Sequence, residues 1–395
     1  MFNRVLFEKY RLQSTIGLLC FGVFILEYLF GWFYLRGERV GFGDLKYILD
    51  CSRELNLKAY FTHGSCPEYM YGVTWLHFSQ IFKIYAVPIP LIMFSIFAIY
   101  SIFTGYLTVF TKKSVAYSVL LLLIPMLFSP PVSLLFERGN LDGVIFEMVF
   151  ASAILATRGM YKSSIILLIF TTLFKFYTFP LLAGELFILS TFKRVNKAFA
   201  LVLVLFVGLI VFKDYSMVEH FPWDARNMFG APIFMEYFYF VFFGPHTHAN
   251  KSLAIVTGVI FAVLIIWILD KNGLKEFHPN IKHFDEAGKS YTSVYMFMLA
   301  VFIPMFFVGL SIDYRLIFIL VPQIMYTFMT KSNLKFFGFN LLLLFLTTFL
   351  SYNTYLLQPI GDFAAIMIVA IQIHFLVINR KTLAISIVYK PKSLD

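Results

Sequence analysis

Residues 162–192 have the sequence KSSIILLIFTTLFKFYTFPLLAGELFILSTF, which is two apolar runs joined near Lys175 and Pro180. Each run has about 15 residues, fewer than the roughly 20 that a helix needs to cross a bilayer. If the stretch were one long tilted helix, most basic residues of the downstream loops would lie outside the cell. The positive-inside rule opposes that arrangement and predicts a hairpin of two short helices. Broken elements at membrane depth are tolerated only where they line a cavity or pack within protein.

The whole chain has the composition of a membrane protein. Of its 395 residues 60% are hydrophobic and 14% are charged, whereas soluble domains contain about 45–50% apolar residues. The apolar stretches are long and do not alternate as the strands of membrane β-barrels do. The sequence therefore predicts an all-α, polytopic membrane protein with about 12 membrane-embedded helices, forming one domain over residues 1–395. The expected segments are 14–36, 87–111, 114–135, 141–157, 162–177, 178–192, 197–213, 252–270, 291–311, 315–330, 335–351 and 361–378.

The basic residues predict the orientation of these segments. The net charge of +10 arises from Lys and Arg clusters in short loops, so topology explains it without nucleic acid as a partner. Most of the 32 Lys and Arg residues lie in alternate loops, and we expect these loops and both termini to face the cytoplasm. The prediction is a multi-pass protein of the inner (plasma) membrane whose first segment is a signal anchor. Two longer regions, 37–86 and 214–251, are then expected on the outer face.

The first outer region contains two of the three cysteines, Cys51 and Cys66. In an oxidising compartment such a pair can close a disulfide, and the alternative is two unpaired thiols. Residues 44–56 of this region have the apolar spacing of a helix that lies on the membrane surface. His246 and His248 of the other outer region are too isolated to predict a metal site. A requirement for a divalent metal is left open.

Charged and polar residues gather at the predicted outer ends of the helices. They come from distant parts of the chain: Asp44, Glu137, Arg138, Asn140, Asp142, Lys175, Asp313 and Arg315. Charges at this depth are costly, so each is a candidate functional residue. Simpler explanations stay open, namely a helix-end ion pair between Arg138 and Asp142 and snorkelling of Lys175 to the headgroups. Together such groups have a chemical use, because cations hold the phosphate of a lipid-linked donor while a carboxylate accepts a proton from an attacking hydroxyl.

In their order and shared sidedness, these residues resemble the GT-C superfamily of integral membrane glycosyltransferases that use polyprenyl-phosphate sugars. The branch that the chain resembles most includes bacterial polyprenyl-phosphate-mannose-dependent α-mannosyltransferases of envelope lipids. The resemblance extends over residues 40–330. It rests on Asp44 after the first segment, Cys66–Tyr71, Arg138–Asn140, Lys175–Tyr177 before Pro180, and Asp313–Arg315. The chain has Cys66-Pro67-Glu68-Tyr69 where family members often have Tyr-Pro-Pro.

The resemblance implies transfer of a hexose, such as mannose, from a polyprenyl-phosphate donor to an envelope glycan or lipid acceptor, on the outer face and without a cofactor. It implies inversion at the anomeric carbon and Asp44 as general base, with Asp50 as a competitor for that role. The implied donor-phosphate ligands are Arg138, Lys175 and Arg315, and the implied sugar or acceptor contacts are Asn140, Asp313, Tyr314 and Tyr69. Two alternatives remain: a lipid-linked glycan flippase or secondary transporter, and an O-antigen polymerase. The one-sided polar set opposes a transporter, whose site is expected near the midplane.

Overall fold

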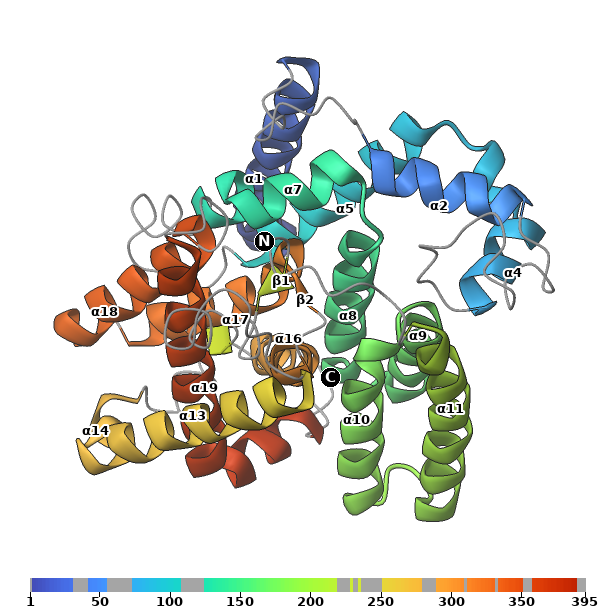
Figure 1. Cartoon of the computed structure of the whole chain (residues 1–395). Helices are drawn as coiled ribbons and strands as arrows, with labels where there is room; N and C mark the ends of the chain where they lie inside the picture. The colour runs from blue at the N-terminus through green and yellow to red at the C-terminus, as the bar shows by residue number, and fades with distance from the viewer. Residues whose placement is uncertain are drawn as a thin grey trace, which may run out of the picture. The chain divides into compact units, whose positions relative to one another are not determined.

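The structure is a computed structural model, and the residues that it describes are almost all helical (Figure 1). It describes residues 2–30, 42–54, 73–107, 124–218, 228–229, 234–235, 251–278, 289–308, 311–330, 333–350 and 357–388. The elements before residue 220 are α1 (Phe2–Phe30), α2 (Gly43–Glu54), α4 (Val73–Ile81), η1 (Ile84–Ala86), α5 (Ile89–Leu107), α7 (Pro130–Arg138), α8 (Asp142–Thr157), α9 (Tyr161–Phe174), η3 (Phe176–Thr178), α10 (Phe179–Thr191) and α11 (Lys197–Val218). The later elements are β1 (Met228–Phe229), α13 (Lys251–Lys271), α14 (Leu274–Phe277), α16 (Lys289–Val308), β2 (Ser311–Ile312), η5 (Asp313–Leu316), α17 (Ile317–Met329), α18 (Leu334–Phe345), η6 (Leu346–Leu350) and α19 (Gln358–Val388).

Every predicted segment overlaps one of these helices, so the all-helical fold class is confirmed. Within the described ranges, three helices are long and apolar enough to cross a membrane: Ile89–Leu107, Leu253–Lys271 and Gln358–Arg380. Ile124–Arg138 and Asp142–Thr157 qualify together as a fourth candidate, although the two are bent by 110° at the break between them. Further apolar helices are shorter, with 10–17 residues. The count of about 12 membrane-embedded helices stays a prediction.

The chain forms two compact units. The first contains Met1–Phe128, Val132–Leu155 and Met160–Pro222, and the second contains Ser129–Pro131, Ala156–Gly159 and Trp223–Asp395. Membership of both units in one domain over residues 1–395 stays a prediction.

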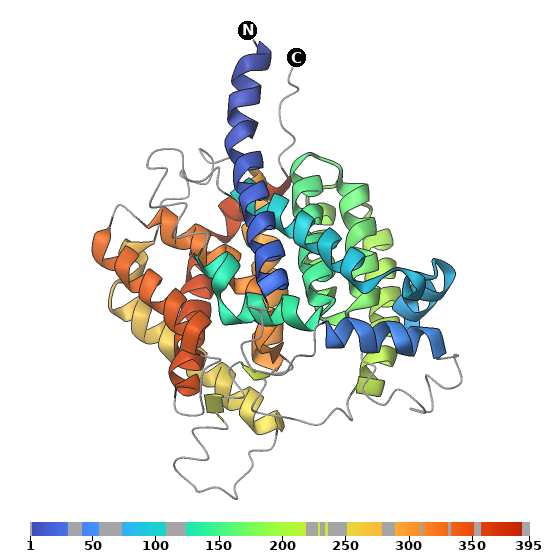
Figure 2. The same ribbon diagram turned by 90° about the horizontal axis from the view of Figure 1, so that it is seen from above.

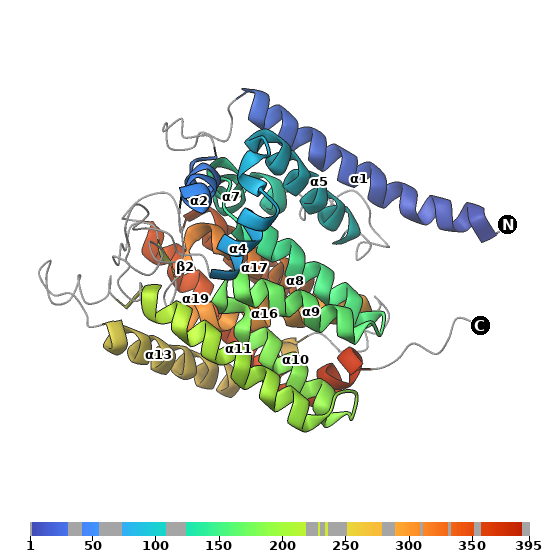
Figure 3. The same cartoon turned by 90° about the vertical axis from the view of Figure 1, so that its right-hand side faces the viewer.

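In the first unit, α1 and α5 lie side by side (Figure 3) because small residues let their backbones approach closely. A Cβ atom on Gly105 would lie 2.5 Å from the backbone oxygen of Gln13, so only glycine fits at this crossing. Aromatic rings then join these helices to α7. The Phe136 ring centroid lies 4.7 Å from that of Phe24 and 5.0 Å from that of Phe97. This packing fixes the end of α7, from which the candidate site is built.

The hairpin predicted over residues 162–192 is present. Helix α9 ends at Phe174, Lys175 has an extended backbone (φ −143°, ψ 109°), and α10 follows after the short turn η3. Pro180 stands in the first turn of α10, where its missing N–H would have no helical partner anyway. Helices α9, α10 and α11 pack on one another and form the green bundle of Figures 1 and 2. The prediction of two short helices is therefore confirmed.

Helix α2 covers most of the predicted surface helix, but the role expected for its apolar face is wrong. Leu45, Ile48 and Leu49 are only 1–3% exposed, since α2 packs against α4 and η1. The side chain of Gln80 on α4 also donates a hydrogen bond to the backbone oxygen of Ser52, at 3.0 Å. The apolar face of α2 is thus buried in protein, and α2 becomes a fixed platform for residues in its first turn.

In the second unit, strands β1 and β2 pair antiparallel, with Met228 opposite Ile312 and Phe229 opposite Ser311. The pair joins the region 214–251 to the turn that precedes η5, and the placement of both on the outer face stays a prediction. The core holds a chain of buried polar side chains from four helices: Tyr295 donates to Gln372, Gln372 to Gln323, and Gln323 to Asn340. Each amide both donates and accepts here, which removes the cost of burying it.

Candidate functional site: a polar chain at the bend between α7 and α8

The site begins at the sharp bend between α7 and α8. Gly139 has a positive φ of 63°. The N–H of Gly139 donates to the backbone oxygen of Phe136 and that of Asn140 to the oxygen of Leu135, both at 3.1 Å. This is the Schellman pattern that ends helices, and it favours glycine because a Cβ is strained at positive φ. The bend therefore follows from the sequence Arg-Gly-Asn.

The bend also lies directly against the start of α2. A Cβ atom on Gly139 would lie 3.0 Å from Cβ of Leu45 and 3.2 Å from Cβ of Phe42. The backbone N–H of Phe42 donates to the backbone oxygen of Glu137, at 2.7 Å. This close backbone contact brings the first turn of α2 to the last turn of α7.

Asp44, in that first turn of α2, is held by two partners from the bend. Arg138 donates from Nε and Nη2 to Oδ1 of Asp44, at 2.8 and 2.7 Å. Asn140 donates from Nδ2 to Oδ2 of the same carboxylate, at 2.8 Å. The side chain of Arg138 is 45% exposed and that of Asp44 is 18% exposed. Both groups are thus fixed in orientation and still reachable from outside the protein.

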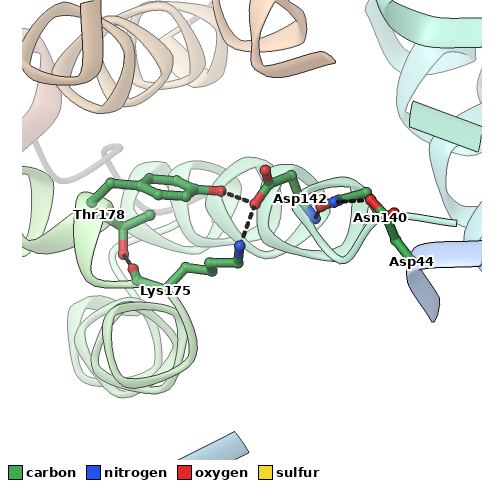
Figure 4. Close-up of polar contacts among 6 residues, drawn as sticks. Asp44, Asn140, Asp142, Lys175 and Thr178 are labelled. Atoms are coloured by element: carbon green, nitrogen blue, oxygen red, sulfur yellow. Dashed lines mark hydrogen bonds and ion pairs between the residues drawn. The ribbon is translucent and has the colours of Figure 1, made fainter. Parts of the chain in front are cut away.

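Asn140 continues the chain inward (Figure 4). Its Oδ1 accepts a hydrogen bond from the backbone N–H of Asp142, at 2.9 Å. Because the amide donates at one end and accepts at the other, its orientation is determined by its neighbours. Asn140 therefore couples the Asp44 carboxylate to the first turn of α8.

The buried end of the chain is an ion pair. Oδ1 of Asp142 lies 3.7 Å from Nζ of Lys175 and accepts a hydrogen bond from the hydroxyl of Tyr177, at 2.6 Å. The exposed fractions of the Asp142 and Lys175 side chains are 0% and 3%. The turn that carries Lys175 is held by Thr178, which donates from Oγ1 and from its backbone N–H to the Lys175 backbone oxygen. The aspartate also stands in the first turn of α8, where the helix dipole stabilises a negative charge.

This geometry decides between several sequence-based interpretations. Arg138 and Asp142 lie on two different helices, and Arg138 pairs with Asp44, which is 94 positions away. The interpretation as a helix-end pair of Arg138 and Asp142 on one helix is therefore wrong. Lys175 is buried in protein and does not snorkel. Asp50 lies on α2 and is exposed, and the choice between Asp44 and Asp50 as general base stays a prediction.

The other predicted site residues are not part of this chain as the structure describes it. Arg315 is in the second unit, in η5, and is 7% exposed. Asp313 and Tyr314 belong to the same short helix, and their side chains lie outside the description. Tyr69 falls outside the described residues. All of their assigned contacts with sugar, acceptor or phosphate stay predictions.

The predicted disulfide between Cys51 and Cys66 is described only at one of its two ends. Cys51 is disulfide-bonded, and Cys20 is a free, buried thiol. Cys66 lies outside the described residues, so its pairing with Cys51 stays a prediction.

Sequence analysis missed the role of Tyr177 and treated Asp142 only as part of a local cluster. The signal for Tyr177 was its position two residues after a lysine at a predicted membrane-depth turn, where a buried charge needs hydrogen-bonding neighbours. Among the described residues, no group of three His, Cys, Asp or Glu side chains is placed to hold a metal ion. The site thus offers the accessible carboxylate of Asp44 and the accessible guanidinium of Arg138, both held in place by the polar chain.

Comparisons with known proteins do not place the chain in a family: it matches no protein-family model, no curated protein and no solved structure.

Proposed function

We propose that this protein is a membrane glycosyltransferase that moves a hexose from a polyprenyl-phosphate donor to an envelope glycan or lipid acceptor. The observation that supports this most directly is the pairing of a partly exposed Asp44 with a half-exposed Arg138. A carboxylate and a guanidinium side by side supply the two groups that sugar transfer from a phosphate requires: a proton acceptor and a phosphate ligand.

The reaction follows from these two groups. An acceptor hydroxyl oxygen attacks the anomeric carbon, its proton passes to the Asp44 carboxylate, and the bond from that carbon to the phosphate oxygen breaks. The polyprenyl phosphate leaves with the bonding electron pair, and the half-exposed guanidinium of Arg138 stabilises its charge. Asn140 keeps the Asp44 carboxylate oriented toward the acceptor. In this proposal the site faces the outer side of the plasma membrane and both termini are cytoplasmic.

Lys175 enters the proposal in a changed role. Its charge is matched by Asp142 inside the protein, so the structure supports it as a residue that positions the chain rather than as an exposed phosphate ligand. Arg315, together with the sugar and acceptor contacts of Asp313, Tyr314, Asn140 and Tyr69, remains part of the proposal on the strength of the family resemblance alone.

One observation favours a second candidate, a secondary transporter of lipid-linked glycans. The helices α7 and α8 form a candidate span broken by a 110° bend, and transporters often bind their substrates at such broken helices. A functional test therefore has to measure substrate movement as well as sugar transfer.

The experiment is a comparison of two variants in proteoliposomes. Asp44→Asn removes the proton acceptor and keeps the shape, whereas Asp50→Asn makes the same chemical change on the exposed face of the same helix. With a panel of polyprenyl-phosphate sugars and product detection by mass spectrometry, we expect Asp44→Asn to transfer sugar at least about a hundredfold more slowly. Asp50→Asn should retain activity close to that of the unmodified protein.

Two results would overturn the proposal. Equal activity of the two variants would remove Asp44 from the chemistry. Movement of a fluorescent donor lipid between leaflets without any sugar transfer, across the whole donor panel, would establish the transporter instead.

A further inference from the structure

A buried glutamate, Glu185, lies in the middle of α10 in the first unit. Its carboxyl oxygen Oε1 accepts a hydrogen bond from Oγ of Ser164 on α9, at 2.8 Å. Oγ of Ser164 lies 2.8 Å from Oγ of Ser152 on α8, and Oγ of Ser152 donates to the backbone oxygen of Ser164, at 3.0 Å. Both serines are 0% exposed and Glu185 is 3% exposed. These three residues, the Ser–Ser–Glu cluster, therefore join three helices through buried polar groups.

The cluster contains no positive charge that could balance an ionised Glu185. Within the described residues, no Lys, Arg or His side chain forms an ion pair with this carboxyl group. Its second oxygen, Oε2, is buried and has no hydrogen-bond partner there. An ionised carboxylate with one hydroxyl donor and no cation is very costly to bury, and such a group takes up a proton instead.

The hydrogen bonds of the cluster fit the neutral acid. With a hydrogen on Oε1, Glu185 donates to Oγ of Ser164, the Ser164 hydroxyl donates to Oγ of Ser152, and the Ser152 hydroxyl donates to the backbone oxygen of Ser164. Every hydroxyl hydrogen then has an acceptor. The oxygen that is left without a partner, Oε2, is a neutral carbonyl oxygen, which costs less to bury than a charged one.

Loss of the proton requires only that the two serine hydroxyls turn. Ser164 then donates to Oε1 of Glu185, and Ser152 donates to Ser164, across the same distances between oxygen atoms. The three helices stay joined in both forms. The two forms thus differ by a buried negative charge and not by a contact between helices.

The basic side chains around the cluster are exposed or already paired. The charged and titratable side chains described on the surrounding elements are Asp142 and Glu147 of α8, Tyr161 and Lys162 of α9, Lys175 and Tyr177 of the hairpin turn, and Lys193, Arg194 and Lys197 between α10 and α11. Lys175 pairs with Asp142, and the other four cations are exposed. Tyr161 interacts electrostatically with both Arg194 and Glu185. Proton exchange between the cluster and the solution is therefore expected at this end of the bundle.

We propose that Ser152, Ser164 and Glu185 form a proton-binding site inside the bundle of α8, α9 and α10, and that this site is occupied at neutral pH. Its ligand is H⁺, which Oε1 of Glu185 takes up from the solution and returns to it. A metal cation fits less well, because hard cations take about six to eight oxygen ligands and these side chains supply fewer. The site shares no residue with the Asp44 chain and does not rest on the proposed function.

The sign of the pH effect follows from the bound proton. The native state keeps the proton on Glu185, whereas the unfolded state releases it above the ordinary pKa of an exposed glutamate, about 4.3. The unfolded state then binds fewer protons than the native state, so the stability contributed by this site falls as the pH rises. A difference of one proton shifts the unfolding equilibrium by about tenfold for each pH unit.

The first test compares the unmodified protein with Glu185→Gln, whose amide donates to Ser164 as the neutral acid does but does not titrate. The matched control is Glu276→Gln, which makes the same change at an exposed glutamate of α14. Unfolding in mixed micelles at pH 5, 6 and 7 is followed by Trp fluorescence. We expect the unmodified protein to lose stability relative to Glu185→Gln by about tenfold for each pH unit, and Glu276→Gln to follow the unmodified protein. A difference from Glu185→Gln that is constant over this range, or that changes in the opposite direction, would refute the proton site.

A second test uses the unmodified protein and covers the case in which Glu185→Gln does not fold. A hydrophobic carbodiimide reacts with protonated carboxyl groups, so peptide mass spectrometry at neutral pH should find Glu185 modified and Glu276 unmodified. Modification at Glu276 without modification at Glu185 would show that Glu185 is ionised and would overturn the proposal. Modification of Glu185 that sodium chloride suppresses at constant pH, while choline chloride does not, would show that a metal cation is the ligand and would overturn it too.

Discussion

Lys175→Met tests the polar chain at its buried end. The substitution removes the cation beside Asp142 and leaves a carboxylate whose side chain has 0% exposure. Removing one partner of a buried ion pair typically costs about 3–5 kcal/mol, because the other charge stays uncompensated. The Coulomb attraction across 3.7 Å, at an effective dielectric constant of about 20, is about 4 kcal/mol and thus of similar size. Tyr177 still donates to the carboxylate, so we expect a loss of about 3 kcal/mol.

This loss corresponds to more than about a hundredfold in the unfolding equilibrium. It can be measured by unfolding in mixed micelles at neutral pH. Lys162→Met is the matched control, since Lys162 lies on the same hairpin but is exposed, and it should change stability by less than about 0.5 kcal/mol. Adding Asp142→Asn to Lys175→Met removes the stranded charge and should restore part of the loss. Equal stability of the two lysine variants, or a double variant weaker than Lys175→Met, would refute the reasoning.

Two further predictions concern the bend and the disulfide. Gly139→Ala should cost more stability than Gly159→Ala, because both glycines have positive φ but an added Cβ contacts Leu45 only at Gly139. We expect the two losses to differ by about 1–3 kcal/mol in the same unfolding assay, as overpacking typically costs. Equal losses would show that the close contact at Gly139 does not matter. Cys51→Ser should destabilise the protein by about 2–5 kcal/mol, and peptide mapping without reduction should find Cys51 joined to Cys66; a Cys51 thiol that alkylates before reduction would contradict both statements.

The sequence was sufficient to predict the helical fold and the position of the hairpin. The two apolar runs of the hairpin are each too short for a full crossing and are separated by Lys175 and Pro180. Only a pair of helices then places most basic residues of the later loops on the inner side. The shared position of Asp44, Arg138 and Asn140 was also predictable, because all three follow or end predicted segments on the same side of the membrane.

The pairings within the site were not predictable from sequence. Arg138 and Asp142 have the spacing of a helical ion pair, but Gly139 ends α7 between them and turns each toward a different partner. That outcome depends on the buried face of α2, which brings Asp44 to the bend through contacts between residues more than 90 positions apart. Neither periodicity nor local spacing contains that information.

The charges along the chain have a consequence for any ligand. The two ion pairs, Arg138 with Asp44 and Lys175 with Asp142, each join one positive and one negative formal charge. If the proposed donor binds here, its phosphate therefore meets a guanidinium that already faces the Asp44 carboxylate. In the proposed function, the donor phosphate would compete with the Asp44 carboxylate for the N–H groups of Arg138, so binding of the anion would also free the carboxylate.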